Sequence, residues 1–437
     1  MTRLLLTGGH LIDPASGWDG PGDLVIEDGR IAAIGPVGRA GPADRTIDGA
    51  GRLVVPGLID LHVHLREPPF ADTSGLDPAV LAETIATGAA AAVAGGFTTI
   101  CAMPNTTPPV DSAEAVAWYL ERGRKAGLAR VLPVGCMTRG RAGRQPADLS
   151  AMRTAGAAAF SDDGADVADA EVFERVLAAA AGIGAPVLCH CEDASLAAGG
   201  VLHDGPLATM LGLPGLSRDA EDVAVQRACD AARRTGCRVH ICHVSTEGAV
   251  DLVRRAKASG APVTAEATPH HLTRVVDDLA GRDPVFKVSP PLRTGHDVDA
   301  VLAGVRDGTI DCLATDHAPH TAAAKARRLA EAPAGMIGLE SALPVYVKAL
   351  VAPGLLTWLQ LIERMTVRPA QVLGIEAGAL ARGGPADVTV IDPDARWTID
   401  PQRFASRARN CPFAGWEVRG RVTHTLVGGR VVYECNG

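Results

Sequence analysis

Residue types that bind metal ions recur through the middle of the chain, each beside a short apolar run. They are His62, His64, Asp162, Asp163, His190, His243 and Asp316. Imidazole nitrogens and carboxylate oxygens are ligands that hold zinc and related divalent ions in proteins. Several runs that each offer such a ligand therefore predict a metal centre.

The spacing within two of these motifs indicates which side chains face the same way. His62 and His64 are two residues apart, so on a strand both point to one face. Cys189 and Cys191 flank His190 in the same way. If His190 points toward the centre, both thiols point away from it, and we expect them to be core residues rather than ligands.

Several other polar residues have an ordinary structural interpretation. Arg66 could form an ion pair with Glu67 or Asp72, and Asn105 could be a turn residue.

The aspartate pair and the remaining histidines also leave alternatives open. Asp162 and Asp163 could cap the helix that follows them. His270 and His271 lie beside a later run and are ambiguous. We expect structural or surface roles for His10, His203, His240, His296 and His424.

Eight apolar runs alternate with Ala-rich helical patterns in the central part of the chain. The runs cover residues 57–64, 97–104, 129–136, 157–164, 186–193, 238–245, 262–269 and 311–318. Strands that alternate with helices predict parallel βαβ units, and eight units favour a closed (β/α)8 TIM-type barrel. The alternative is an open doubly wound sheet, but no GxGxxG motif follows the first run. In a barrel, polar residues at the carboxyl ends of the strands would meet at one face.

The two ends of the chain have a different pattern, with short β-rich runs broken by Gly and Asp. Neither end is long enough to form a full domain alone. We therefore expect residues 1–55 and 376–437 to pair into one small β-sandwich domain, and residues 56–375 to form the barrel.

Composition excludes several classes of protein. The 437 residues carry 42 Lys plus Arg against 50 Asp plus Glu, a net charge of −8, which argues against a nucleic-acid-binding protein. No apolar run reaches the roughly 18 residues of a membrane span, and the N-terminus lacks a long signal-peptide core. The ten cysteines form no paired CxxC motifs, so we expect reduced, buried thiols and a cytoplasmic protein.

Eight motifs in a fixed order carry a family resemblance. They read IDLHVHLREP, GFTTICAMPNTTPPVDS, FSDDG, HCED, HICHVST, TAEATPHHL, PPLR and ATDHAPH. This series resembles the bacterial type I dihydroorotases, a branch of the metal-dependent amidohydrolase superfamily, over nearly the whole chain. The resemblance implies a (β/α)8 barrel with a small β-domain from both termini. It also implies zinc-dependent, reversible cyclisation of N-carbamoyl-L-aspartate to L-dihydroorotate in pyrimidine synthesis.

The resemblance also implies roles for particular residues. Two zinc ions would be held by His62, His64, Asp163, His190, His243 and Asp316, with Asp163 bridging both ions. Asp316 would also act as the general base and then donate its proton to the leaving nitrogen. The substrate carboxylate would be bound by Arg66, Asn105 and His320. Further substrate contacts are expected at Ser289, Ala334 and Gly335.

The chain departs from the family pattern at three places. The loop over residues 67–83 is longer than the usual short turn after the first strand, and its role stays open. Ser289 stands where many relatives have Asn. Ala334 precedes Gly335 where an aromatic residue is common. These departures concern substrate contacts and leave the expected metal ligands unchanged.

Lysine content separates this family from its neighbours. Many amidohydrolases, including hydantoinases and allantoinases, bridge their metal ions with a carboxylated lysine on the fourth strand. Of the five lysines here, Lys125 alone lies between His64 and His190, in a predicted helix. The Asp163 carboxylate needs no modification to carry a negative charge.

Two other functions are alternatives to the dihydroorotase activity that the resemblance implies. A hydantoinase-like cyclic amidohydrolase is the first, and Arg66 and the missing lysine count against it. A catalytically inactive scaffold for aspartate transcarbamoylase is the second, although such relatives usually lose metal ligands. Association with that transferase could also coexist with activity, and relatives suggest a homodimer. A small-molecule substrate is expected, with no nucleic acid or membrane as partner.

Overall fold

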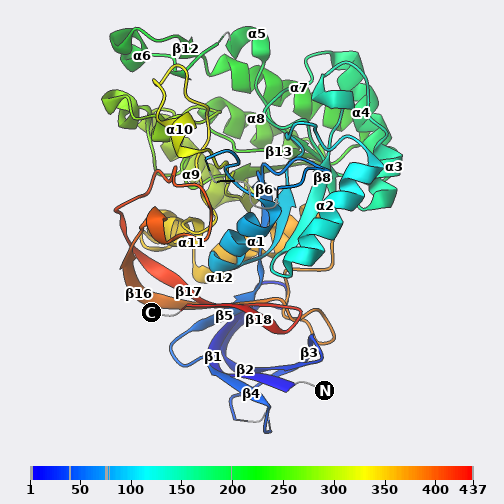
Figure 1. Cartoon of the computed structure of the whole chain (residues 1–437), viewed down its shortest axis with the longest axis vertical. Coiled ribbons are helices and arrows are strands. Elements are labelled where there is room, and N and C mark those ends of the chain that lie inside the picture. Colours follow the sequence, from blue (N-terminus) through cyan, green and yellow to red (C-terminus); the bar gives the residue numbers. More distant parts are fainter. Residues whose placement is uncertain (1–2, 39–40, 74–76, 78, 198, 436–437) are drawn as a thin grey trace.

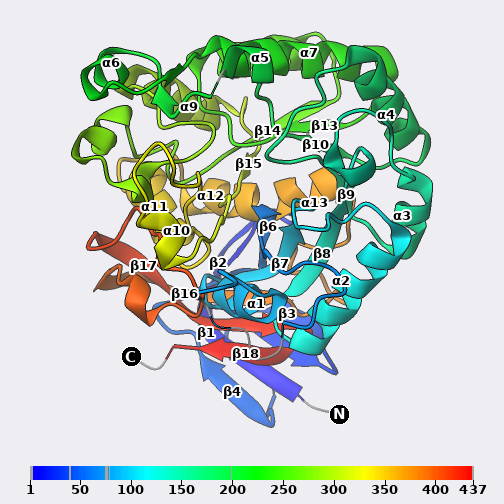
Figure 2. The same ribbon diagram turned by 45° about the horizontal axis from the view of Figure 1, so that its top comes forward.

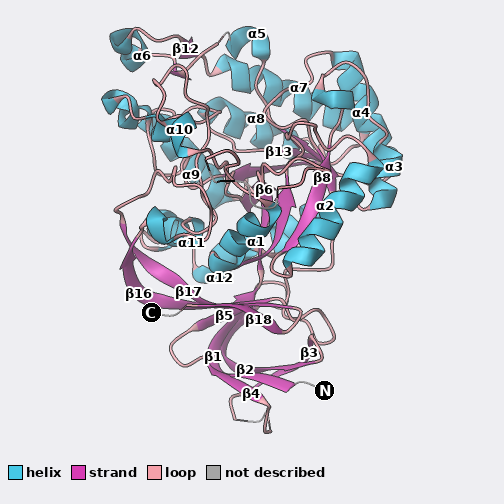
Figure 3. Ribbon diagram, in the orientation of Figure 1, coloured by secondary structure: helices cyan, strands magenta, loops and turns pink. Residues whose placement is uncertain are grey.

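The computed structural model describes residues 3–435 except 39–40, 74–76, 78 and 198. Figure 1 shows a barrel surrounded by helices, with a separate sheet below it that contains both termini. Figure 3 shows the same division, with helices gathered around the barrel and the sheet largely free of them.

Eight parallel strands form the barrel, as predicted. In spatial order they are β6 (Leu58–Val63), β7 (Phe97–Ala102), β8 (Arg130–Gly135), β9 (Ala159–Phe160), β10 (Val187–Cys189), β13 (Val239–Ile241), β14 (Val263–Ala267) and β15 (Cys312–Leu313). Each strand lies within one of the eight apolar runs. The ring closes just beyond β15, where Val63 and His317 form a parallel bridge and the His64 amide donates to the His317 carbonyl at 2.8 Å.

Helices surround the strands (Figure 2). The longer ones are α1 (Ile85–Ala94), α2 (Ala113–Ala126), α3 (Leu149–Ala155), α4 (Ala170–Gly182), α7 (Asp219–Thr235), α8 (Glu247–Ala258), α9 (Gly295–Asp307), α12 (Trp358–Met365) and α13 (Val367–Leu373). Shorter helices are α5 (Ala194–Ala197), α6 (Pro206–Leu211), α10 (Ala322–Lys325) and α11 (Ala342–Tyr346), and a π-helical turn covers Val347–Val351.

Helix α2 illustrates why these segments are helical and where they end. Ser112 caps it by accepting a hydrogen bond from the Ala115 amide at 3.2 Å. Gly127 ends it with a φ of 66°, the left-handed conformation that glycine adopts without strain. Val116 and Tyr119 are buried against the barrel. The apolar stripe thus fixes which face of the helix turns inward.

The terminal segments form one continuous eight-stranded sheet. Its strands are β1 (Arg3–Asp13), β2 (Trp18–Glu27), β3 (Arg30–Gly35), β4 (Arg45–Asp48), β5 (Leu53–Pro56), β16 (Val388–Thr398), β17 (Glu417–Val427) and β18 (Arg430–Glu434). The antiparallel pairing of β5 with β16 joins the two ends of the chain. A separate apolar core includes Leu6, Leu24, Val54, Val388 and Leu426, so strands from both ends enclose one interior.

The cysteines behave as the sequence predicts. All ten are free, and nine of them are buried. Cys189 and Cys191 belong to the large apolar core, which also contains residues of α7 such as Val225 and Ala228. Within the described part of the chain, no helix has both the length and the apolar character needed to cross a bilayer.

Candidate metal centre

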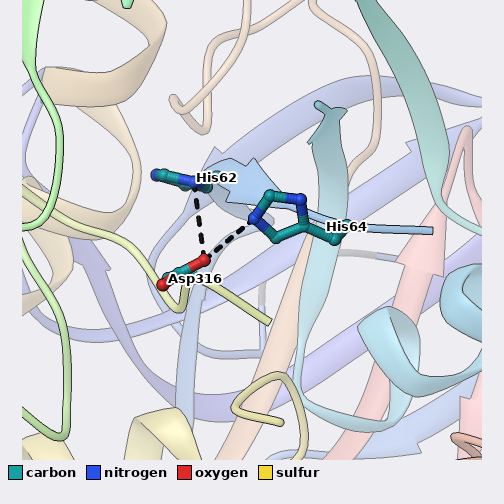
Figure 4. Close-up of side chains that lie close together, drawn as sticks. All are labelled: His62, His64 and Asp316. Atoms are coloured by element: carbon teal, nitrogen blue, oxygen red, sulfur yellow. Dashed lines mark hydrogen bonds and ion pairs between the residues drawn. The ribbon is translucent and has the colours of Figure 1, made fainter. Parts of the chain in front are cut away.

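The first and last strands of the barrel bring together two histidines and an aspartate (Figure 4). His62 lies on β6, His64 directly follows it, and Asp316 follows β15. The Asp316 Oδ1 atom is 3.0 Å from His64 Nε2 and 3.5 Å from His62 Nε2. All three side chains are buried. This trio has the ligand types and the separation of a divalent-metal site.

Asp163 lies between this trio and a second pair of histidines. Its Oδ1 atom is 3.2 Å from His62 Nε2, 3.7 Å from His190 Nδ1 and 3.9 Å from His243 Nε2. Its Oδ2 atom is 3.4 Å from His64 Nε2. His190 Nδ1 and His243 Nε2 are themselves 2.9 Å apart. One carboxylate therefore faces both histidine pairs, the position that a bridging ligand would need.

The unsatisfied atoms of the cluster fit a cation. His62 Nε2 and Asp163 Oδ1 are both buried, yet neither makes a hydrogen bond within the described chain. Buried polar atoms normally have partners, so such orphaned acceptors call for an explanation such as a bound ion. Burial, together with the neighbouring His190, lowers the pKa of His243 to about 3, which leaves its ring nitrogen free to act as a ligand.

The two carboxylates of the cluster are held in their ionised form. Burial alone would raise the pKa of Asp163, but His62 and His64 hold it well below its usual range. His62 and His64 likewise lower the pKa of Asp316 against the effect of burial. Both aspartates therefore offer negative charge to a metal ion at neutral pH.

A second layer of side chains orients the β6 histidines. His62 Nδ1 is 2.8 Å from Glu266 Oε1, and the other oxygen of Glu266 is 3.1 Å from His240 Nε2. Burial opposes ionisation of Glu266, but the bonds to His240 and His62 lower its pKa to about 2. His64 Nδ1 is 2.8 Å from Asn105 Oδ1. These contacts turn both Nε2 atoms toward the centre.

A cavity of about 260 Å³ opens onto the cluster. All predicted ligands except His62 line it: His64, Asp163, His190, His243 and Asp316. So do all six predicted substrate residues: Arg66, Asn105, Ser289, His320, Ala334 and Gly335. His62 has no exposed surface. The structure therefore brings together every site residue expected from the sequence, while their roles remain predictions.

Arg66 and Asn105, for which an ion pair and a turn were the alternative interpretations, both line the cavity. Glu67 pairs with Arg122 at 2.7 Å, whereas Arg66 Nε donates to the Pro319 carbonyl at 3.2 Å. Asn105 contacts His64, and its Nδ2 lies 3.4 Å from Asp163 Oδ2. Asn105 thus contacts two of the proposed metal ligands and does not serve only to form a turn.

The two aspartates of FSDDG have different surroundings. Asp162 accepts hydrogen bonds from the Met137 and Thr138 amides at 2.8 and 3.1 Å and supports the loop after β8. Asp163 alone faces the histidines. Neither caps the following helix, because α4 is capped by Asp169.

The ambiguous histidines lie just outside the cavity. His271 Nε2 is 3.0 Å from the Pro290 carbonyl. His270 is buried, its Nε2 has no partner within the described chain, and its ring centre is 4.5 Å from that of His271.

His320 and Gly335 shape one wall of the cavity. His320 Nε2 is 2.7 Å from the Ala334 carbonyl, so Nδ1 is the ring nitrogen left for a ligand. Burial, helped by the charges of Arg66 and Lys325, lowers the pKa of His320 to about 3. Gly335 has a φ of 137°, and a Cβ there would lie 2.8 Å from His320 Nε2. Glycine is therefore required at this position.

Asn410, which supports the same wall, stands in no motif that would have marked it as a site residue. This residue lies between β16 and β17, in the part predicted to belong to the small β-domain. Its Nδ2 donates to the Ala318 and Gly335 carbonyls, both at 3.1 Å, and its Oδ1 accepts from the His320 amide at 3.2 Å. The C-terminal region thus contributes directly to the site.

The long loop over residues 67–83 is only partly described, because residues 74–76 and 78 lie outside the described residues. At its start, Glu67 accepts hydrogen bonds from the Thr73 hydroxyl and the Ile85 amide, both at 2.7 Å. At its end, Glu83 lies 3.4 Å from His317 Nε2. The described ends of the loop are therefore tied to the barrel.

Comparison with known proteins gives one family. Residues 51–249 match the model of the family described as dihydro-orotase-like. The chain is 48% identical to the dihydroorotase of Pelotomaculum thermopropionicum over 99% of each chain. It is 47% identical to that of Anaeromyxobacter sp. strain K, over 99% of this chain and 98% of the relative.

Among solved structures, an L-hydantoinase from Arthrobacter aurescens matches with a TM-score of 0.86 and 28% identity, over 99% of this chain and 96% of that one. A D-hydantoinase matches with a TM-score of 0.80 and 27% identity, over 99% and 95% of the two chains. The barrel fold is thus shared with hydantoinases, whereas near-half identity over the full length is shared with dihydroorotases. The chain belongs to the dihydroorotase family.

Proposed function

We propose that this chain is a metal-dependent dihydroorotase that interconverts N-carbamoyl-L-aspartate and L-dihydroorotate. The observation that carries the proposal is the position of Asp163 between two histidine pairs, in a cavity that Arg66 also lines. This arrangement combines a centre for amide hydrolysis with a group suited to a substrate carboxylate.

The residues that would hold the metal follow from the contacts. One zinc ion would be bound by His62, His64 and Asp316, a second by His190 and His243, with the Asp163 carboxylate shared. Zinc bound at such a centre lowers the pKa of a water ligand and polarises an amide carbonyl.

The chain's own residues would handle the proton and the substrate. The Asp316 carboxylate lies beside His64 at the cavity wall, so it can take the proton of the attacking water. It then gives that proton to the ring nitrogen released from the carbonyl carbon. In the direction of ring closure the same carboxylate acts in the reverse order. The planar guanidinium of Arg66 can bond both oxygens of the substrate carboxylate.

Several features of the biological setting belong to the same proposal. The reaction would serve pyrimidine synthesis. The ten free thiols suit a reducing compartment, and we propose a cytoplasmic location. A homodimer and an association with aspartate transcarbamoylase are proposed from the family resemblance. The boundaries 1–55 with 376–437 for the β-domain and 56–375 for the barrel also remain a proposal.

Hydantoinase activity is the second candidate, favoured by the similarity to solved hydantoinases. The lysine content argues against it. Lys125 lies on α2, where its largely exposed side chain is 3.6 Å from Glu121. Lys125 is therefore not placed to bridge two metal ions at the end of β9.

Hydrolysis of L-dihydroorotate by zinc-loaded protein, in parallel with a hydantoin, tests the proposal. We expect turnover of dihydroorotate that a chelator abolishes and that added zinc restores. Turnover of the hydantoin instead would reassign the substrate. No turnover of either ring with zinc bound would favour the scaffold function.

A further inference from the structure

Glu192 places a third carboxylate in the cavity, in addition to those of the proposed metal ligands Asp163 and Asp316. It follows His190 in the segment after β10 and lines the same cavity as Arg66 and Asp316. Its Oε2 accepts a hydrogen bond from the Ser289 hydroxyl at 2.7 Å. Within the described chain this is its one hydrogen bond, and no lysine or arginine pairs with it. Oε1 is left without a protein donor.

Glu192 does not bind the substrate carboxylate, because the proposed substrate is itself an anion. Glu192 is half-buried, so its carboxylate repels another carboxylate in the cavity but offers Oε1 as an acceptor to a hydrogen-bond donor. Arg66 lies in the same cavity but forms no ion pair with Glu192. The cavity therefore keeps a cation and an acceptor apart, and a fitting ligand has to offer both a carboxylate and a hydrogen-bond donor.

The ring of dihydroorotate offers both groups. It carries one carboxylate, which suits Arg66, and two ring N–H groups, which are donors. We infer that Glu192, held by Ser289, accepts a hydrogen bond from one ring N–H of the substrate. This inference rests on the proposed function and names the part of the substrate that the cavity wall recognises.

The assignment divides specificity between two residues. Ring N–H groups are common to dihydroorotates and hydantoins, whereas the carboxylate distinguishes dihydroorotate. Glu192 then recognises a cyclic amide in general, and Arg66 selects the carboxylated one. Ser289, which stands where many relatives have Asn, acts as a positioning residue because it fixes the Glu192 carboxylate.

The test is a cycle that combines Glu192→Ala with substrates methylated at one ring nitrogen. For the wild type we expect methylation of the recognised nitrogen to lower kcat/KM by about 10- to 100-fold, since a hydrogen bond to a charged group is lost. In Glu192→Ala the same methylation should change kcat/KM by less than about threefold, because the bond is already absent. Methylation of the other nitrogen should affect both proteins equally.

Two matched variants accompany the cycle. Ser289→Ala should weaken the sensitivity to methylation only in part, because Glu192 remains but is less well held. Glu174→Ala removes an exposed carboxylate of α4 that pairs with Arg234. In this control, methylation of the substrate should lower kcat/KM as much as it does in the wild type. Metal content is measured for each variant. If Glu192→Ala loses metal or does not fold, Glu192→Leu takes its place, because leucine has a similar size but no acceptor oxygen, and the same loss of sensitivity is expected.

The outcomes separate this inference from the proposed function. If the wild type does not turn over dihydroorotate at all, the proposed function fails. If the wild type is active but methylation of each of the two ring nitrogens in turn lowers kcat/KM as much in the Glu192 variant as in the wild type, Glu192 does not contact the ring and the inference is wrong.

Discussion

Asp316 faces His64, His62 and the cavity, so it can serve both as a metal ligand and as a general base. As a ligand it needs only an oxygen atom directed at the metal. As a general base it needs an ionised carboxylate, which the two histidines favour. These tasks can be separated by a substitution that keeps the shape and one oxygen.

Asp316→Asn is that substitution. An amide oxygen can still contact the metal, but it cannot take up a proton at neutral pH. We expect kcat to fall by at least about 100-fold, the lower range for loss of a general acid–base group. Rates are measured on protein whose zinc content is shown to equal that of the wild type. Near-normal turnover at equal zinc content would remove Asp316 from the proton transfer.

Arg66→Lys tests the recognition of the substrate carboxylate. A lysine keeps the positive charge but loses the planar pair of donors. We expect KM to rise by about tenfold, with a much smaller change in kcat, because the lost bond concerns binding. Arg234→Lys on the exposed face of α7 is the control. An unchanged KM would return Arg66 to a structural role.

At the scale of elements, the segment between β16 and β17 acts on the barrel from outside it. Asn410 joins the Ala318 and Gly335 carbonyls, which belong to different loops of the cavity wall. Removing its amide would leave these buried carbonyls without donors, and the two loops of the cavity wall would no longer be held together.

Asn410→Ala should therefore lower kcat/KM for dihydroorotate by about 10- to 100-fold, the effect of small misplacements in an active site. Zinc content should not change, because Asn410 contacts none of the proposed ligands. Gln402→Ala, an exposed position in the same segment, should behave as the wild type. Equal activity of the two variants would show that the wall does not depend on Asn410.

Glu340 anchors the same segment and should make its stability depend on pH. It accepts hydrogen bonds from the Ala405 and Ser406 amides at 2.9 and 3.0 Å. Burial raises its pKa to about 7, although these bonds oppose the shift. The folded protein therefore holds a proton that the unfolded chain releases near pH 4.5. Stability from this group is present at low pH and is lost as the pH rises to about 7.

Denaturation by urea at pH 5 and pH 8, of wild type and Glu340→Gln, measures this linkage. We expect the loss of stability between the two pH values to be smaller in the variant, since glutamine does not titrate. Other titrating groups contribute equally to both proteins and cancel in the comparison. An identical loss in both would mean that Glu340 does not titrate in this range.

The strands could be predicted from the sequence because their signal is local. Five of the eight apolar runs carry a metal-binding residue type near their carboxyl end, and the barrel topology brings all carboxyl ends to one face. That is why His62, His190 and Asp316 could be placed together before the fold was known. Asn410 and Glu266 could not, since their roles depend on which side chains meet across the fold. The choice between Asp162 and Asp163 likewise follows from the turn of the backbone after β9.

At the scale of the whole molecule, the metal centre depends on closure of the barrel. Asp60 on β6 accepts hydrogen bonds from the His62 amide at 3.0 Å and from the Thr315 amide at 3.1 Å. It thereby ties the first strand to the segment after the last one. His62 and Asp316 meet only when this seam is closed, so metal binding and closure should favour each other.

Metal removal should consequently lower the thermal stability of the whole chain. A ligand that binds only the folded state stabilises it by mass action. We expect the melting temperature to fall by a few degrees after chelation and to recover with zinc. His190→Ala, which retains the trio at β6 and β15, should recover only part of the difference. A melting temperature that does not respond to chelation in the wild type would contradict this coupling.

The most direct test of the account is a zinc titration of chelated protein in which bound zinc and dihydroorotate hydrolysis are measured on the same samples. We predict that hydrolysis is absent without metal and reaches its maximum as two zinc ions bind per chain, and that Asp163→Ala lowers both quantities. Full hydrolysis by metal-free protein, or undiminished zinc binding and hydrolysis in Asp163→Ala, would contradict it.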